Sequence, residues 1–265
     1  MFINLQAYLT FARLAFQRQN AYRVANWAGL FTNIFFLFFR ASLFESIYPS
    51  GTTIGGLNVK QALSYVCLTQ AILMVIPQWG VIGVDEDIRS GQIATHLSRP
   101  INYYLSTLSQ RLGSSAFFLL FRTLPILGIG AFVGFLFLPT SIARAALFLL
   151  STFLGAWIAI SIHFLAELSA FWMESSRGIK MLFNGLINFF SGMIIPVTFF
   201  PESVRQISRF LPFEYTLNTP TLLYLDKGGN VLHALLAQLT WIGILWIVCT
   251  ILLSYGERKL VVHGG

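Results

Sequence analysis

The chain has 265 residues, of which 56% are hydrophobic and only 10% are charged, whereas about 25% of residues are charged in soluble domains. The net charge of +7 would suggest a nucleic-acid partner in a soluble protein. In a membrane protein, lysine and arginine instead mark cytoplasmic loops, so we expect no nucleic-acid partner. Uncharged stretches at 123–143, 145–166, 181–201 and 228–256 exceed the about 10-residue alternating strands of a membrane barrel. We therefore predict an all-α membrane protein.

The first 23 residues are typical of an amphipathic helix. Gln6, Thr10, Arg13 and Gln17 recur at helical spacing, and apolar residues cover the remaining surface. Such a helix lies in the membrane interface and does not cross the bilayer.

Six apolar segments follow, and a crossing needs about 20 mostly apolar residues. The six predicted transmembrane helices occupy 24–47, 61–83, 106–138, 144–170, 178–197 and 231–255. Because 106–138 is too long for one straight crossing, we expect it to begin with an interfacial portion near Arg111. With the N-terminus in the cytoplasm, ten Lys and Arg residues fall on the cytoplasmic side and five outside, which favours cytoplasmic positions for both termini.

A compact polar island, 84–100, separates the second span from the third and is predicted to be cytoplasmic. Gly91 can reverse the chain direction, and 92–99 can then form about two helical turns ended by Pro100. The acidic triplet, Asp85, Glu86 and Asp87, would precede this helix, where negative charge suits the helix dipole. The island is interpreted either as a coupling helix that docks on a cytoplasmic ATPase or as an ordinary charged loop that sets topology. Its candidate contact residues are Asp85, Glu86, Asp87, Arg89, Gly91, Gln92, Thr95 and Arg99.

Four ionisable residues lie inside predicted spans, where such groups are costly and often functional. Arg40 lies near the outer end of its helix, so it is expected to extend its guanidinium to the membrane surface. Arg122 is deeper and needs a partner or water, which makes it a candidate for the transport pathway or a subunit contact. His163 and Glu167 share one helix face; a structural hydrogen-bonded pair is favoured over a proton relay.

The region between the fifth and sixth spans, 198–228, is rich in proline, which ends or starts helices. It predicts two short helices that dip into or lie on the outer leaflet, forming an outer re-entrant hairpin before the last span. The residues that define this hairpin are Pro196, Pro201, Pro212, Phe213, Glu214 and Pro220.

Four segments resemble the permease subunits of ABC-2 type ABC transporters, in the branch of daunorubicin-like export permeases. They are EDIRSGQIATHLSRPINYY (86–104), SGMIIPVTFFP (191–201), LPFEYTLNTP (211–220) and ERKLVVHGG (257–265). The resemblance covers nearly the whole chain, which is expected to form one transmembrane domain, 1–265. It implies a dimer with an identical or a paralogous permease, a separate ATPase subunit docked at 84–100, and outward movement of drugs, lipids or polysaccharides.

The expected function is therefore the permease subunit of an ATP-driven exporter in a bacterial inner membrane. The sequence contains no phosphate-binding loop, no H-E-x-x-H and no G-x-S-x-G motif, so we expect no catalytic site and no metal or cofactor on this chain, with ATP and magnesium on the partner. Three alternatives remain open: an ion-coupled secondary transporter, which usually has inverted repeats, a membrane-embedded enzyme, and a non-transporting scaffold of a cell-envelope complex.

Overall fold

A computed structural model describes residues 5–49, 51–76, 83–139 and 141–259, and within these ranges the fold is almost entirely helical. The one described pair of strands is a short antiparallel hairpin, β1 (Thr53–Ile54) and β2 (Leu57–Asn58). The α-helices are α1 (Leu5–Gln19), α2 (Arg23–Ser46), α3 (Val59–Leu73), α4 (Val84–Arg89), α5 (Gln92–Leu97), α6 (Tyr103–Phe118), α7 (Leu124–Val133), α8 (Ile142–Leu168), α9 (Arg177–Phe190), α10 (Glu202–Arg209), α11 (Glu214–Tyr224) and α12 (Val231–Glu257). The all-helical prediction is confirmed.

Four helical runs among the described residues are long and apolar enough to cross a membrane. They are Leu5–Ser46, which bends between α1 and α2, Tyr103–Val133, Ile142–Phe171 and Val231–Glu257. The shortest has 27 residues, or about 40 Å at 1.5 Å per residue, which exceeds the about 30 Å hydrocarbon core. The chain is therefore a multi-pass membrane protein.

The second and fifth predicted spans are shorter in the structure than the sequence suggests. In place of a helix over 61–83, α3 has 15 residues and ends at Leu73; positions 77–82 lie outside the described residues. In place of a helix over 178–197, α9 has 14 residues and ends at Phe190. Each helix is about 22 Å long, so neither alone matches the bilayer core.

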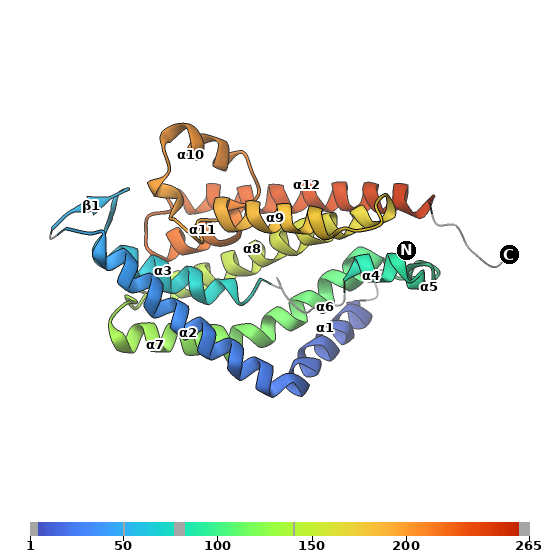
Figure 1. Ribbon diagram of the computed structural model, residues 1–265, viewed down its shortest axis with the longest axis horizontal. Coiled ribbons are helices and arrows are strands. Elements are labelled where there is room, and N and C mark those ends of the chain that lie inside the picture. Colours follow the sequence, from blue (N-terminus) through green and yellow to red (C-terminus); the bar gives the residue numbers. More distant parts are fainter. Residues whose placement is uncertain (1–4, 50, 77–82, 140, 260–265) are drawn as a thin grey trace.

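The two ends of the bundle carry different elements (Figure 1). The beginning of α1, the end of α12 and the α4–α5 segment lie at one end, and the β1–β2 hairpin and α10 lie at the other. The sequence likewise grouped both termini with the island at 84–100.

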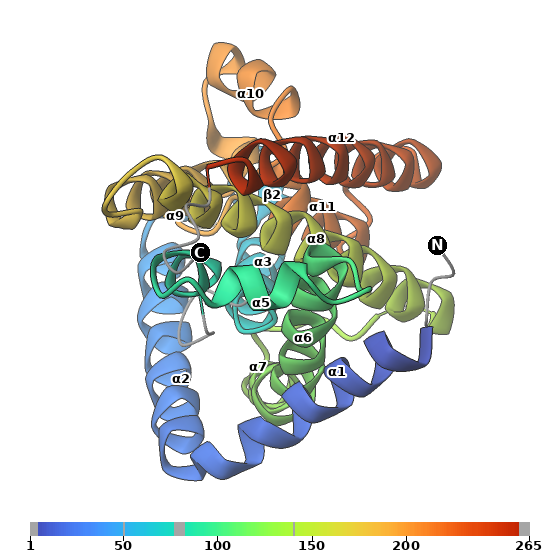
Figure 2. The same cartoon turned by 90° about the vertical axis from the view of Figure 1, so that its right-hand side faces the viewer.

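Two helices form the centre of the bundle, and the others surround them (Figure 2). Every residue of α3 from Ala62 to Leu73 is buried, and most of α8 is buried against α11, α12 and α9. Outer helices expose aromatic and aliphatic side chains, for example Phe31 and Phe35 on α2 and Ile247 on α12. Apolar residues on the outer surface are what lipid-facing helices require.

The first helix packs along α6. Phe16 and Phe117 meet edge to face with ring centroids 5.4 Å apart, and Gly113 gives the backbone of Ala12 room, since a Cβ at that glycine would lie 2.0 Å from the Ala12 carbonyl oxygen. A π-helical segment, η2 (Leu119–Thr123), joins α6 to α7 just before Pro125. Proline has no N–H for the helix ladder, and a π turn accommodates that gap.

Candidate functional site

The polar island folds as two short helices and not as one helix after an acidic loop. Gly91 has φ +74°, a left-handed conformation that glycine adopts without a Cβ penalty, and it reverses the chain between α4 and α5. The acidic triplet precedes α5, as the sequence predicts, but it lies within the first turn of a separate helix, α4. The second helix ends at Leu97, which leaves Arg99 beyond its last turn.

The α4–α5 segment has a buried apolar side and an exposed polar side. Val84, Ile88 and Ile93 are buried, and they belong to one apolar cluster with Tyr104 of α6 and Phe164 of α8. The opposite side exposes Glu86, Arg89, Gln92, Thr95 and Arg99. We call these five residues the polar face of α4–α5. The buried side fixes this face to two of the long helices.

Asp85, predicted as a surface contact, points inward and joins α4 to the start of α9. Its side chain is 9% exposed, and its Oδ2 accepts hydrogen bonds from Ser176 Oγ at 2.7 Å, Lys180 Nζ at 2.5 Å and Arg89 Nη2 at 3.1 Å. Burial acts to raise the pKa of Asp85, but the hydrogen bonds from Lys180 and Ser176 and the attraction to both cations outweigh it, so the pKa lies below its usual value.

Asp87 also makes internal contacts. Its Oδ2 accepts a hydrogen bond from Tyr103 Oη at 2.6 Å and lies 3.8 Å from His96 Nε2. These contacts join α4 to α5 and to the first residue of α6. Of the acidic triplet, Glu86 alone has an exposed side chain, and therefore it is the acidic group available to a partner.

A buried ion pair, Arg111–Glu167, lies behind the island. Arg111 is 2% exposed and its Nη2 donates to Glu167 Oε2 at 2.5 Å, while the same oxygen accepts from the Val84 backbone N–H at 3.3 Å. Arg111 therefore lies in the protein interior, and its predicted position near the membrane interface stays a prediction. The expected His163–Glu167 hydrogen bond is also absent from the described residues: His163 Nε2 is buried without a hydrogen-bond partner there. Glu167 instead pairs across helices, with Arg111 of α6.

Arg122 lies in the π-helical segment and contacts neutral groups of α2. Its Nη2 donates to Asn26 Oδ1 at 2.8 Å and to the Ala25 carbonyl oxygen at 3.4 Å, and its guanidinium lies 4.6 Å from the ring centroid of Phe118. Its predicted role in a pathway or subunit contact stays a prediction.

Arg40 supports irregular backbone and does not extend to the membrane surface. It donates to Gln70 Oε1 at 3.0 Å and to the carbonyl oxygen of Met193, which follows the last turn of α9. The neighbouring Gly192 carbonyl oxygen accepts from Tyr65 Oη at 3.1 Å. Non-helical backbone at membrane depth needs such internal partners, so the expectation that Arg40 extends to the surface is wrong.

The proline-rich region 198–228 contains two short helices, α10 and α11, as the sequence predicts. They differ in burial: α10 projects from the bundle (Figure 1) and exposes Ile207 and Phe210, whereas α11 is largely buried against α8 and α3. Pro220 lies inside α11, so the expectation that each proline begins or ends a helix is wrong there. The other hairpin residues lie at helix boundaries or in the connections: Pro196, Pro201, Pro212, Phe213 and Glu214.

These features define a multi-pass helical membrane protein that carries a rigidly anchored polar segment at one end of its bundle. The chain belongs to the ABC-2 family of transporter proteins, since the model of that family matches residues 31–264. It is also similar to the probable doxorubicin resistance ABC transporter permease protein DrrC of two Mycobacterium tuberculosis strains, CDC 1551 / Oshkosh and H37Rv. In both cases, 25% of 158 residues are identical, and the match covers 60% of this chain and 56% of the relative.

Proposed function

We propose that this chain is the permease subunit of an ATP-driven exporter in a bacterial inner membrane. Two permeases, identical or paralogous, would form the path, and a separate ATPase subunit would bind and hydrolyse ATP with magnesium. The family match and the similarity to DrrC permeases support this proposal. The observation that carries it is the anchoring of α4–α5, because a coupling element must transmit force to the membrane helices.

The polar face of α4–α5 is the proposed ATPase contact. Three links attach this face to separate helices: Asp85 to Ser176 and Lys180, Asp87 to Tyr103, and the Val84 backbone to the Arg111–Glu167 pair. A displacement of α4–α5 is therefore passed to α6, α8 and α9 together. The alternative, a charged loop that only sets topology, needs none of these links.

The proposed topology has six crossings, with α3 and α9 as short helices completed by irregular backbone. Arg40 and Tyr65 support this arrangement, because they provide hydrogen bonds to the carbonyl oxygens of Met193 and Gly192 where α9 has ended. The α10–α11 hairpin would then lie at the outer leaflet, with both termini and α4–α5 in the cytoplasm. The exposed apolar side chains of α10 suit an interfacial position.

An amphipathic, lipid-like or saccharide substrate is proposed for the exporter. The similar permeases are named for doxorubicin resistance, which favours the drug-like end of that range. Transport is proposed to be outward.

A charge reversal on the polar face tests the ATPase contact. Glu86 is exposed and its carboxylate makes no ion pair among the described residues, so Glu86→Arg leaves the internal links intact. Reversing one interfacial charge should weaken ATPase binding by about tenfold or more. The measurement is co-purification of the partner ATPase subunit, together with its substrate-stimulated hydrolysis.

Two matched charge reversals complete the experiment. Glu45→Arg changes an exposed carboxylate in the last turn of α2, which leads to the β1–β2 hairpin at the opposite end of the bundle, and should leave ATPase binding unchanged. Glu174→Arg changes the exposed loop before α9. Loss of binding in Glu174→Arg with normal binding in Glu86→Arg would move the contact from α4–α5 to the loop at 172–180.

A further inference from the structure

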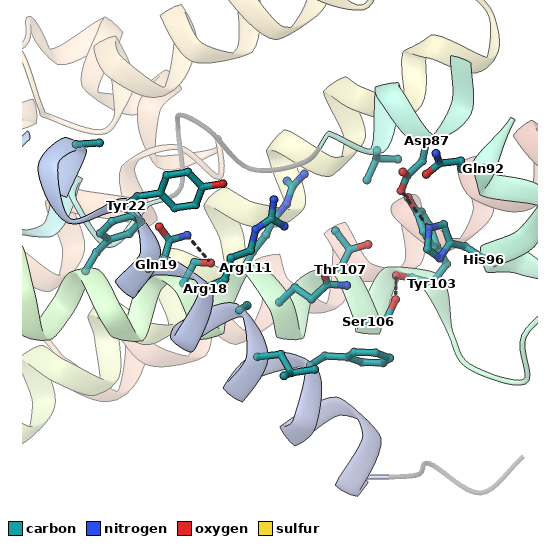
Figure 3. Close-up of a pocket in the computed structure, with 18 of the residues that line it drawn as sticks. Arg18, Gln19, Tyr22, Asp87, Gln92, His96, Tyr103, Ser106, Thr107 and Arg111 are labelled. Carbon is teal, nitrogen blue, oxygen red and sulfur yellow. Dashed lines mark hydrogen bonds and ion pairs between the residues drawn. The ribbon is translucent and has the colours of Figure 1, made fainter. Parts of the chain in front are cut away.

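A cavity of about 640 Å³ lies between α1, the α4–α5 segment and α6. Asp87, His96 and Tyr103 gather at one end, and Gln19 and Tyr22 lie at the other (Figure 3). The cavity extends to Arg122, about 16 Å beyond Arg111 along the helix. It shares Gln92 with the polar face of α4–α5, and the other four residues of that face do not line it.

Three arginines line this cavity, and two of them have no carboxylate partner in the described part of the chain. Arg111 is neutralised by Glu167 at 2.5 Å. Neither Arg18 nor Arg122 forms a described ion pair. Asp87, the acidic residue of the lining, lies at the far end and is engaged by Tyr103 and His96.

The donors of Arg122 are incompletely used. Asn26 and Ala25 accept from Nη2, and Nη1 donates to the weak acceptor Met74 Sδ at 3.9 Å, while Nε is buried without a hydrogen-bond partner among the described atoms. A cation near the hydrocarbon region is costly unless an anion or water compensates it. Arg122 and Arg18 together therefore favour an anionic ligand.

Apolar side chains line the same cavity. Phe11 and Leu14 come from α1 and Phe118 comes from α6, and Leu14 is 55% exposed. A cavity that combines cations without a carboxylate partner with an apolar wall fits an amphiphile. A small hydrated anion would gain nothing from the apolar wall.

We propose that this cavity binds an anionic phospholipid, with its phosphate group held by Arg18 and Arg122. Guanidinium groups bind phosphate oxygens in a bidentate geometry with charge-assisted hydrogen bonds. Phe11, Leu14 and Phe118 lie along the path of an acyl chain. The site does not depend on transport, so it stands or falls separately from the exporter function.

The test measures lipid binding by the full-length chain, purified in a neutral detergent and stripped of lipid. Short-chain phosphatidylglycerol, phosphatidylcholine and inorganic phosphate are added separately, and binding is followed by native mass spectrometry and by thermal unfolding. The wild-type chain should bind phosphatidylglycerol about fivefold or more tightly than phosphatidylcholine, and phosphate alone should give no stabilisation. Stabilisation by phosphate equal to that by phosphatidylglycerol would overturn the lipid as the occupant.

Paired variants assign the site. Arg18→Gln with Arg122→Gln should abolish the preference for phosphatidylglycerol. Arg13→Gln with Arg209→Gln removes the same charge from exposed positions that do not line the cavity, and should retain the preference. Equal behaviour of the two double variants would overturn the proposal.

The single variant Arg18→Gln is the control in case the double variant does not fold. Arg18 is exposed and makes no described side-chain ion pair, so this variant should unfold at the wild-type temperature without lipid. Its preference for phosphatidylglycerol should fall by about threefold or more. An unchanged preference would contradict the assignment, whatever the double variant does.

Discussion

Removal of Glu167 should destabilise the fold more than almost any other single carboxylate change. Arg111 is 2% exposed, and Glu167 provides both its 2.5 Å ion pair and a hydrogen bond to the Val84 backbone. Glu167→Ala leaves the Arg111 charge buried without compensation, which costs about 3–5 kcal/mol. For a domain of roughly 250 residues, about 1 kcal/mol corresponds to a melting-temperature shift of roughly 2–4 °C, so we expect a decrease of about 6–20 °C.

A double-mutant cycle separates this ion pair from simple loss of packing. Arg111→Met removes the charge and keeps much of the side-chain volume, so the variant with both changes should recover most of the stability lost in Glu167→Ala. The assay is thermal unfolding of the purified chain in detergent, followed by tryptophan fluorescence. A decrease below about 2 °C in Glu167→Ala, or strictly additive losses in the double variant, would refute the reasoning.

Three further predictions concern topology, Arg122 and pH. A cysteine at exposed Ser90 should react with a membrane-impermeant thiol reagent only after the cytoplasmic side is opened, and a cysteine at Ser203 should react from outside. The two native cysteines are buried, and reversed labelling would contradict the topology. Arg122→Ala should reduce transport or complex yield more than Arg144→Ala, because the latter loses a surface pair with a 73%-exposed carboxylate; equal yields would contradict this. The pKa of Asp85 is lower in the folded protein than in the unfolded chain, so the unfolded chain binds a proton at this carboxylate more readily. The ionised Asp85 therefore stabilises the fold fully above the unfolded pKa of about 3.9, and this stabilisation is lost as the pH falls through the lower folded pKa. Asp85→Asn should therefore unfold at a lower temperature than wild type at pH 7 and show a flatter acid limb, and an unchanged pH profile would argue against this contribution.

Local sequence patterns predicted the helices that are apolar along most of their length. The runs around α2, α8 and α12 are apolar for more than 20 residues, so length alone indicates them. The position of Gly91 between two short polar segments likewise predicted the turn inside the island.

Long-range hydrogen bonds explain what the sequence could not predict. Glu167 has His163 four residues away on its own helix, and the spacing rule for helices considers only such neighbours; its real partner, Arg111, is 56 residues away. Asp85 was assigned to the surface because its neighbours are charged, yet Ser176 and Lys180, 91 and 95 residues away, draw it inward.

The early end of α9 at Phe190 could not be predicted from the sequence for a related reason. The apolar run 181–201 continues past Phe190, so composition predicts a continuing helix. The chain instead leaves the helix because Gly192 adopts φ +79° and Arg40 and Tyr65 satisfy the freed carbonyl oxygens. The signal that the sequence offered was the presence of Tyr65 and Arg40, two side chains with hydrogen-bond donors, within apolar segments.

Site-specific photo-cross-linking tests the proposed ATPase contact most directly. A photoreactive amino acid at Gln92, on the polar face of α4–α5, should capture the ATPase subunit in intact cells, while the same group at Ile207 of α10 should not. Capture from Gln92 alone is the result that the proposed function predicts. A third probe is placed at position 172, in the loop before α9. Capture from position 172 without capture from Gln92, or no capture from any of the three positions, would contradict the assignment of α4–α5 as the coupling element.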